Sequence, residues 1–135
     1  MDRAALVHTV RPCDHKSCRL PAGCSVIWNL QPDVESVERV LRHKLAQHEM
    51  AYVGITEWPY WRMVGGVSPR GNEVPGHFPR FSKMTVCFCC SREHAQILET
   101  YLVDKYFGKL YNRAQGGGGV SSMVNSFFFV YVAWP

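Results

Sequence analysis

The longest apolar run of the chain, FFFVYVAW at residues 127–134, constrains the fold more than any other stretch. A helix that spans a membrane needs about 20 consecutive apolar residues, so this run is too short to cross a bilayer. Its aromatic and β-branched residues favour a buried strand instead. A buried strand needs other elements to cover it, so the rest of the chain has to supply sheet partners and helices.

Three shorter apolar runs predict further strands at residues 25–30, 51–56 and 83–90. Two stretches with helical periodicity predict amphipathic helices, one from an N-cap at Asp33 to about Glu49 and one from a cap at Ser91 to a stop at Gly108. Their apolar faces consist of Val34, Val37, Val40, Leu41 and Leu45 in the first helix and Ala95, Leu98, Leu102 and Tyr106 or Phe107 in the second.

Pro59 suits the first turn of a short helix that carries Tyr60, Trp61 and Arg62. Residues 65–81 are rich in glycine and proline and predict a long loop. The order of elements predicts a small α/β (α+β) fold, with a three- to four-stranded mixed or antiparallel sheet flanked by helices. We expect residues 1–24 to be an N-terminal extension and residues 25–135 to form a single domain.

The composition agrees with one folded domain. The chain has 135 residues, of which 47% are hydrophobic and 19% charged, and this balance excludes wholesale disorder. The net charge of +4 and the pI near 8.8 indicate a polyanionic partner, although mildly. The N-terminal residues lack the apolar core of a secretory signal, so we expect a cytoplasmic or nuclear protein with reduced thiols and no membrane partner.

The cysteines and the glycine run suggest no separate chemistry. Cys13, His15, Cys18 and Cys24 are potential zinc ligands, but their spacing matches no zinc knuckle, so zinc is not expected. Strand alternation places Cys87 and Cys89 on one face, where they are expected to be buried free thiols. Residues 116–119, four glycines, lack the lysine and serine of a phosphate-binding loop and predict a flexible connection.

Four polar residues follow one another on successive predicted elements. Tyr52 begins the sequence Tyr-Val-Gly on the second strand, and Arg62 lies ten positions later on the short helix. Glu99 lies on the helix after the third strand, and Asn112 follows it by 13 positions. This ordered set resembles the signature of the GIY-YIG nuclease superfamily over residues 25–112. In that family a first strand, carrying the GIY tyrosine, forms a hairpin with the YIG strand, whereas here the upstream strand carries Ile27 and Trp28.

The resemblance implies a metal-dependent endonuclease that hydrolyses phosphodiester bonds. Glu99 would hold one Mg²⁺ or Mn²⁺ ion, which keeps most of its water ligands. Arg62 would bind the phosphate, Tyr52 would orient or deprotonate the attacking water, and Asn112 would support the site.

A nucleic acid, with DNA favoured over RNA, is the expected partner. Phosphate contacts and base stacking are expected from the cations and aromatic residues near the site, namely Trp58, Trp61, Arg70, Arg80, Lys83, Lys105 and Arg113. Two other hypotheses stay open: a catalytically inactive nucleic-acid-binding module, favoured by the absent upstream tyrosine, and a protein-interaction domain that uses the aromatic loop of residues 58–81. Separately, Tyr52 as a half-buried aromatic residue and Glu99 as a solvated helix residue are the structural alternatives.

Overall fold

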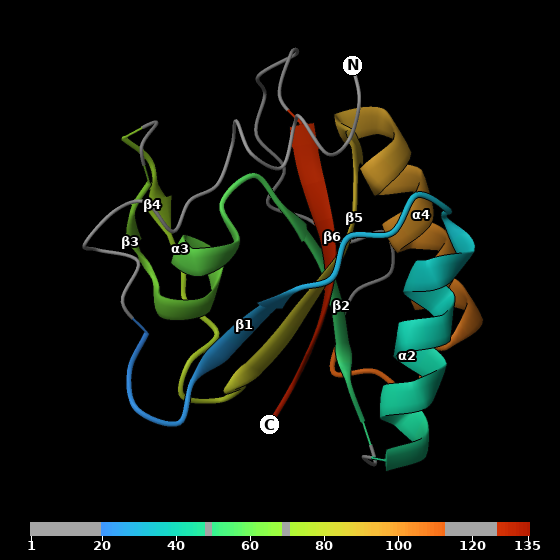
Figure 1. The fold of residues 1–135 in the computed structure, drawn as a ribbon, viewed down its shortest axis with the longest axis horizontal. Helices are drawn as coiled ribbons and strands as arrows, with labels where there is room; N and C mark the ends of the chain where they lie inside the picture. The colour runs from blue at the N-terminus through green and yellow to red at the C-terminus, as the bar shows by residue number, and fades with distance from the viewer. Residues whose placement is uncertain (1–19, 48–49, 69–70, 113–126) are drawn as a thin grey trace.

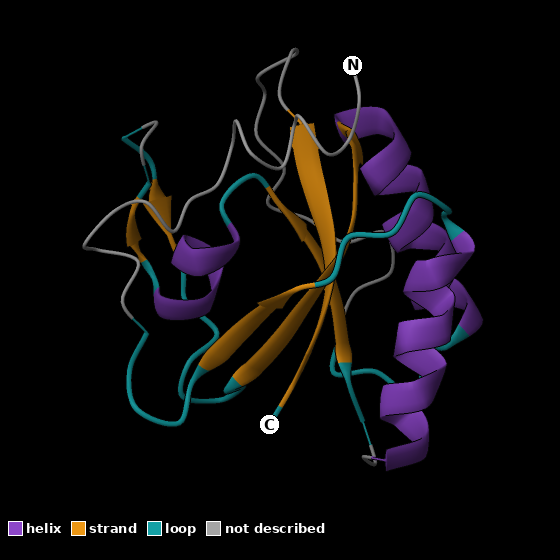
Figure 2. Cartoon of the chain, in the orientation of Figure 1, coloured by secondary structure: helices purple, strands orange, loops and turns teal. Residues whose placement is uncertain are grey.

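The computed structural model describes residues 20–47, 50–68, 71–112 and 127–135. They form a mixed sheet of four strands, β1 (Ser25–Trp28), β2 (Tyr52–Thr56), β5 (Lys83–Ser91) and β6 (Phe127–Trp134), in the order β1-β5-β6-β2. Strand β1 runs parallel to β5, whereas β6 is antiparallel to both of its neighbours. The predicted α/β fold, with a small mixed sheet flanked by helices, is therefore confirmed (Figure 2).

Strand β6 lies inside the sheet, and this position explains its composition. Seven of its eight residues are buried. Phe128, Val130 and Val132 enter the core on one face of the sheet, and Phe129 and Tyr131 enter the core on the other. An apolar residue is favoured at almost every position because both faces are covered.

Helices α2 (Glu35–Gln47) and α4 (Arg92–Lys105) lie side by side on one face of the sheet (Figure 1). The Ser91 hydroxyl accepts a hydrogen bond from the His94 N–H at 3.3 Å, which confirms the predicted cap of α4. Glu38 of α2 accepts a hydrogen bond from the Tyr106 hydroxyl at 2.5 Å and pairs with Lys105 at 2.7 Å, so it ties the two helices together.

The opposite face carries helix α3 (Pro59–Val64), which begins with Pro59 as predicted. Two short antiparallel strands, β3 (Gly66–Val67) and β4 (Glu73–Val74), follow it. Residues 65–81 were predicted to be a long loop, and the structure differs in that this segment contains these two short strands. None of the helices within the described residues is long and apolar enough to cross a membrane.

The prediction that Cys87 and Cys89 share one face of β5 was wrong. The register between β5 and β6 shifts between Val86 and Phe88, and such an irregularity breaks the alternation of side chains. Cys87 therefore joins the core beneath α2 and α4, and Cys89 joins the core on the α3 side. Both thiols are buried, as predicted, and neither forms a disulfide with another described cysteine. Cys13, His15, Cys18 and the four glycines of residues 116–119 lie outside the described residues.

Candidate active site

The centre of the site is a close contact between two strands. Gly54 of β2 lies directly opposite Tyr131 of β6, and the phenol ring of Tyr131 passes over the glycine. A Cβ atom at position 54 would stand 2.3 Å from the Tyr131 hydroxyl oxygen, so only glycine leaves room for this ring. The phenol is completely buried, and burial, as the largest influence, raises the pKa of Tyr131 well above its usual value.

His77 completes a buried polar pair with this phenol. Its Nε2 atom lies 2.7 Å from the Tyr131 hydroxyl oxygen. The backbone N–H of His77 donates to the Arg62 carbonyl at 3.0 Å, so the segment after β4 is held against α3. Burial lowers the pKa of His77 to about 3, and the positive charges of Arg62 and Arg80 lower it further in the same direction. The imidazole is therefore neutral at physiological pH.

Tyr52 stacks over the same pair. It lies on the same face of β2 as Gly54, since side chains two residues apart in a strand share a face. Its ring centroid is 4.7 Å from that of His77 and 6.2 Å from that of Tyr131. Tyr52 is only half-buried, so its phenol is the more accessible of the two.

Arg62 brings positive charge to these groups from α3. Its guanidinium donates a hydrogen bond to the Pro75 carbonyl and also hydrogen-bonds with the Tyr131 side chain. The same charge lowers the pKa of Glu99, which burial otherwise raises. Arg62 therefore lies within electrostatic reach of both Tyr131 and Glu99, so three of the four residues predicted from the motif, Tyr52, Arg62 and Glu99, lie around the phenol of Tyr131.

Glu99 lies in the middle of the buried face of α4, which consists of Ala95, Glu99, Leu102 and Val103. Only 3% of the residue is exposed, and its Oε1 atom has no hydrogen-bond partner among the described residues. Burial raises the pKa of this carboxyl to about 7. The alternative of a solvated helix residue is therefore wrong for Glu99, because the buried face of the helix is rotated toward Glu99 and away from the half-buried Leu98.

Asn112 acts on the backbone of β2. Its Oδ1 atom accepts from the Val53 N–H at 3.1 Å, and its Nδ2 group donates to the Val53 carbonyl at 2.7 Å. Tyr111 adds a backbone hydrogen bond to the Ala51 carbonyl at 2.8 Å. The side chain of Asn112 thus takes the place of a strand partner along the edge of β2.

The upstream strand does not supply a first tyrosine. β1 pairs with β5 and not with β2, and the Trp28 indole donates to the Tyr60 hydroxyl at 3.1 Å. The strand that pairs with β2 is β6, so Tyr131 from the end of the chain stands beside the Tyr-Val-Gly segment. Sequence reasoning missed Tyr131 and His77. The available signals were a single polar group in an otherwise apolar strand and a lone histidine 15 positions after Arg62.

The residues predicted to bind nucleic acid do not all face solvent. Trp61 is buried in a small aromatic cluster, and Trp58 contacts its ring at a centroid distance of 5.7 Å. Lys105 pairs with Glu38, and Lys83 donates to the Gly23 carbonyl at 3.1 Å. Arg80 is exposed and lies near the site, since its charge lowers the pKa of His77. The other two predicted cations, Arg70 and Arg113, lie outside the described residues.

The side chains of the candidate site fit a divalent ion that is held by a single protein carboxylate, that of Glu99. Within residues 20–47, 50–68, 71–112 and 127–135, no group of three or more His, Cys, Asp or Glu side chains is placed to share a metal ion. Mg²⁺ nevertheless requires few protein ligands, because it retains several waters and binds substrate phosphate oxygens. The unpartnered Oε1 atom of Glu99, within electrostatic reach of Arg62, is suited to such an ion.

Comparisons with protein-family models, with curated proteins and with solved structures gave no match to this chain.

Proposed function

We propose that this chain is a metal-dependent endonuclease of the GIY-YIG type that hydrolyses phosphodiester bonds in nucleic acid, with DNA as the favoured substrate. The observation that carries the proposal is the convergence of Tyr52, Arg62, Glu99, His77 and Tyr131. These residues come from two strands, two helices and a loop. Tyr52 and His77 contact the buried phenol of Tyr131, Arg62 hydrogen-bonds with it, and Glu99 lies within electrostatic reach of it.

The pairing of β6 with β2 supports the family assignment. In the GIY-YIG family, which the motif resembles, a first tyrosine is expected on the strand that pairs with the Tyr-Val-Gly strand. Tyr131 occupies that position, opposite Gly54, although its strand is the last of the chain. The proposed nuclease thus carries the motif in a permuted order, with the first element at the C-terminal side of the others.

The chemistry follows from the charges of the site. A guanidinium presents several N–H donors in a plane, so Arg62 is suited to hold a phosphate as negative charge develops on it. Glu99 would hold the Mg²⁺ or Mn²⁺ ion, which when bound supplies positive charge to the phosphate and lowers the pKa of coordinated water.

Tyr52 would orient the attacking water, because its phenol is the accessible one. His77 and Tyr131 are positioning residues in this proposal. Their hydrogen bond fixes the imidazole, and the imidazole packs edge-on against the Tyr52 ring at an interplanar angle of 65°. A fixed ring places the phenol oxygen at one point relative to the phosphate, and fixed placement accounts for a large part of catalysis in general.

The second candidate is a nucleic-acid-binding module without catalysis, and a protein-interaction domain is a further alternative. The burial of Tyr131 and Glu99 favours the binding module without catalysis. Both residues are at most 3% exposed, so a substrate would have difficulty in reaching them. A cleavage assay, together with measurements of DNA binding and of the mass in solution, separates all three.

The test compares wild type, Glu99→Gln and Glu93→Gln on supercoiled plasmid and branched DNA, with Mg²⁺, with Mn²⁺ and with EDTA. Glu93 is an exposed residue of the same helix, so its variant is a control for the loss of one charge. We expect metal-dependent cleavage by wild type and by Glu93→Gln, and a loss of about 100-fold or more in Glu99→Gln.

Binding that weakens with salt but gives no cleavage under any of these conditions would favour the inactive module. An absence of binding, together with a mass that rises with protein concentration, would favour the interaction domain.

A further inference from the structure

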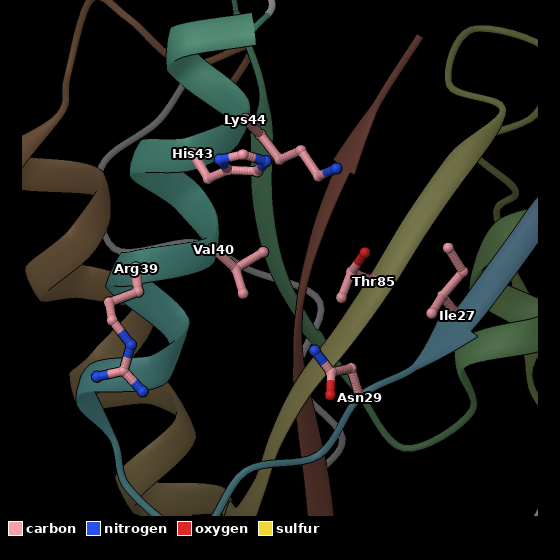
Figure 3. A pocket seen from close by; sticks show the side chains of 7 residues that line it. All are labelled: Ile27, Asn29, Arg39, Val40, His43, Lys44 and Thr85. Carbon is pink, nitrogen blue, oxygen red and sulfur yellow. The ribbon is translucent and has the colours of Figure 1, made fainter.

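A trough lies on the face of the sheet that carries α2, opposite Tyr52 and Tyr131. Its volume is about 290 Å³, and it separates α2 from the edge formed by β1 and β5 (Figure 3). The floor is made by Ile27, Asn29 and Thr85. None of the residues of the candidate active site lines it.

The topology of the sheet creates this trough. Strand β1 is only four residues long and is added outside β5, with Ile27 paired to Thr85. Helix α2 packs mainly on β5 and β6, whereas the helix that packs on β1 is α3, on the other face of the sheet. Ile27 is consequently 51% exposed although it lies in a strand.

The wall on the helix side is cationic. One turn and a half of α2 contributes Arg39, Val40, His43 and Lys44. Arg39 is engaged by Asp33 at 3.3 Å, whereas no carboxylate among the described residues pairs with Lys44. The Lys44 ammonium lies 4.1 Å from the centroid of the Trp134 ring, and its side chain extends from α2 toward the sheet (Figure 3).

The floor adds neutral hydrogen-bond donors. The Oδ1 atom of Asn29 already accepts from Gln31 at 2.8 Å, so its NH₂ group is left to donate. Thr85 adds a hydroxyl to the lining, and the residue is 6% exposed. The lining therefore offers an ammonium, an amide and a hydroxyl, and it contains no carboxylate.

We propose that this trough binds the phosphate group of a small phosphate monoester. Such a group carries up to two negative charges and three strong acceptor oxygens, which match a cation surrounded by donors. Lys44 would supply the charge, Thr85 and Asn29 the neutral hydrogen bonds, and Ile27 and Val40 an apolar contact for the organic part. The volume is at the lower limit of ligand pockets, which indicates a ligand of about mononucleotide size.

This proposal does not depend on the proposed function, because none of the residues of the candidate active site lines the trough. The phosphate ester has two possible sources, a free mononucleotide or the 5′-phosphate end of a nucleic-acid strand. The experiment distinguishes them by using both as probes.

Amide chemical shifts of the full chain are followed by NMR during titration with inorganic phosphate, a deoxynucleoside 5′-monophosphate, the unphosphorylated nucleoside, and a short oligonucleotide with and without a 5′-phosphate. We expect saturable shifts at residues 27, 29, 40–44 and 85 with the monophosphate, and none there with the nucleoside. Saturation by the phosphorylated oligonucleotide alone would assign the trough to strand ends.

Three variants test the assignment at constant ionic strength. Lys44→Met keeps the apolar stem on Trp134 and is expected to weaken binding about tenfold, as the loss of a charge-assisted hydrogen bond would. Thr85→Val is expected to weaken binding about threefold. Lys109→Met removes an equal charge from an exposed position outside the trough and should leave the affinity within about twofold.

The proposal is overturned if no phosphorylated probe shifts these amides, if the nucleoside binds as well as its monophosphate, or if Lys109→Met weakens binding as much as Lys44→Met. The last result would mean that the phosphorylated probes are attracted to the positive charge of the whole protein and not to the trough.

Discussion

At the scale of single residues, Glu99 is placed where its charge opposes folding. The carboxyl is buried, lacks a partner for Oε1, and has a pKa raised to about 7. The folded state therefore holds the proton more tightly than the unfolded state between the usual pKa of 4.5 and about pH 7. Stability falls as the pH rises through that window, by about 3 kcal/mol at most. Such an unfavourable charge is typical of a group that is kept for binding or catalysis.

We predict that Glu99→Gln stabilises the protein at pH 8 in EDTA, with an increase in Tm of several degrees, and changes little at pH 4.5. At pH 4.5 the wild-type carboxyl is protonated in the fold, so the amide replaces a neutral group. Thermal unfolding at the two pH values is the measurement. If the difference in Tm between Glu99→Gln and wild type is the same at pH 8 and at pH 4.5, the carboxyl is not buried in the way described. The control, Glu93→Gln, should leave the stability nearly unchanged at each pH.

At the scale of elements, the free edge of β2 is closed by one side chain. Both backbone groups of Val53 bond to Asn112, and Val53 is completely buried. Unpaired backbone groups at a buried edge are costly, and an exposed edge also invites pairing with other chains. Asn112 therefore holds in place the strand that carries Tyr52 and Gly54.

We predict that Asn112→Ala lowers the stability by about 1–3 kcal/mol, because it leaves the Val53 N–H and C=O without partners. For a domain of this size that corresponds to a decrease in Tm of roughly 5–15 °C. The measurements are a thermal melt and the hydrogen exchange of the Val53 amide. Asn72→Ala, at an exposed position between β3 and β4, is the control. Unchanged protection of the Val53 amide in Asn112→Ala would contradict this account.

At the scale of the whole molecule, β6 belongs to the site through its sheet contacts and not through its place in the chain. It pairs with β2 along five residues and with β5 along most of its length. Its C-terminal end also lies close to β1, since Ser82 bonds to the Pro135 carbonyl at 2.7 Å and to the Ser25 N–H at 2.8 Å. The ladders of the sheet hold Tyr131 in its place beside Gly54.

We predict that a circular permutant, in which Pro135 is joined to Met1 and new ends are opened between Gly117 and Gly118, folds to the same structure. It would place the strand of Tyr131 ahead of the strand of Tyr52 in the sequence. The circular dichroism spectrum, the Tm and, if wild type cleaves DNA, the cleavage rate are the measurements. A permutant that stays unfolded would show that the connection between residues 112 and 127 is needed for β6 to pair.

Local patterns alone were sufficient for the helices and for the four strands of the main sheet, but not for the short strands β3 and β4. Apolar runs predicted β1, β2, β5 and β6, helical periodicity predicted α2 and α4, and Pro59 and Ser91 marked the starts of α3 and α4. These features depend on residues close together in the chain, so the sequence carries them directly. Tyr52, Arg62, Glu99 and Asn112 were found in the same way, by their spacing on those elements.

The sequence determined which elements form, and only the tertiary structure decided how they meet. Strand order is set by contacts between distant residues, so no local pattern indicated that β6 would pair with β2 or that β1 would pair with β5. For that reason the phenol beside Gly54 was sought upstream, at Trp28, and not at Tyr131. His77 reaches this phenol only because its loop folds back onto Arg62, and the burial that leaves Glu99 with a raised pKa comes from the packing of α4 on the sheet.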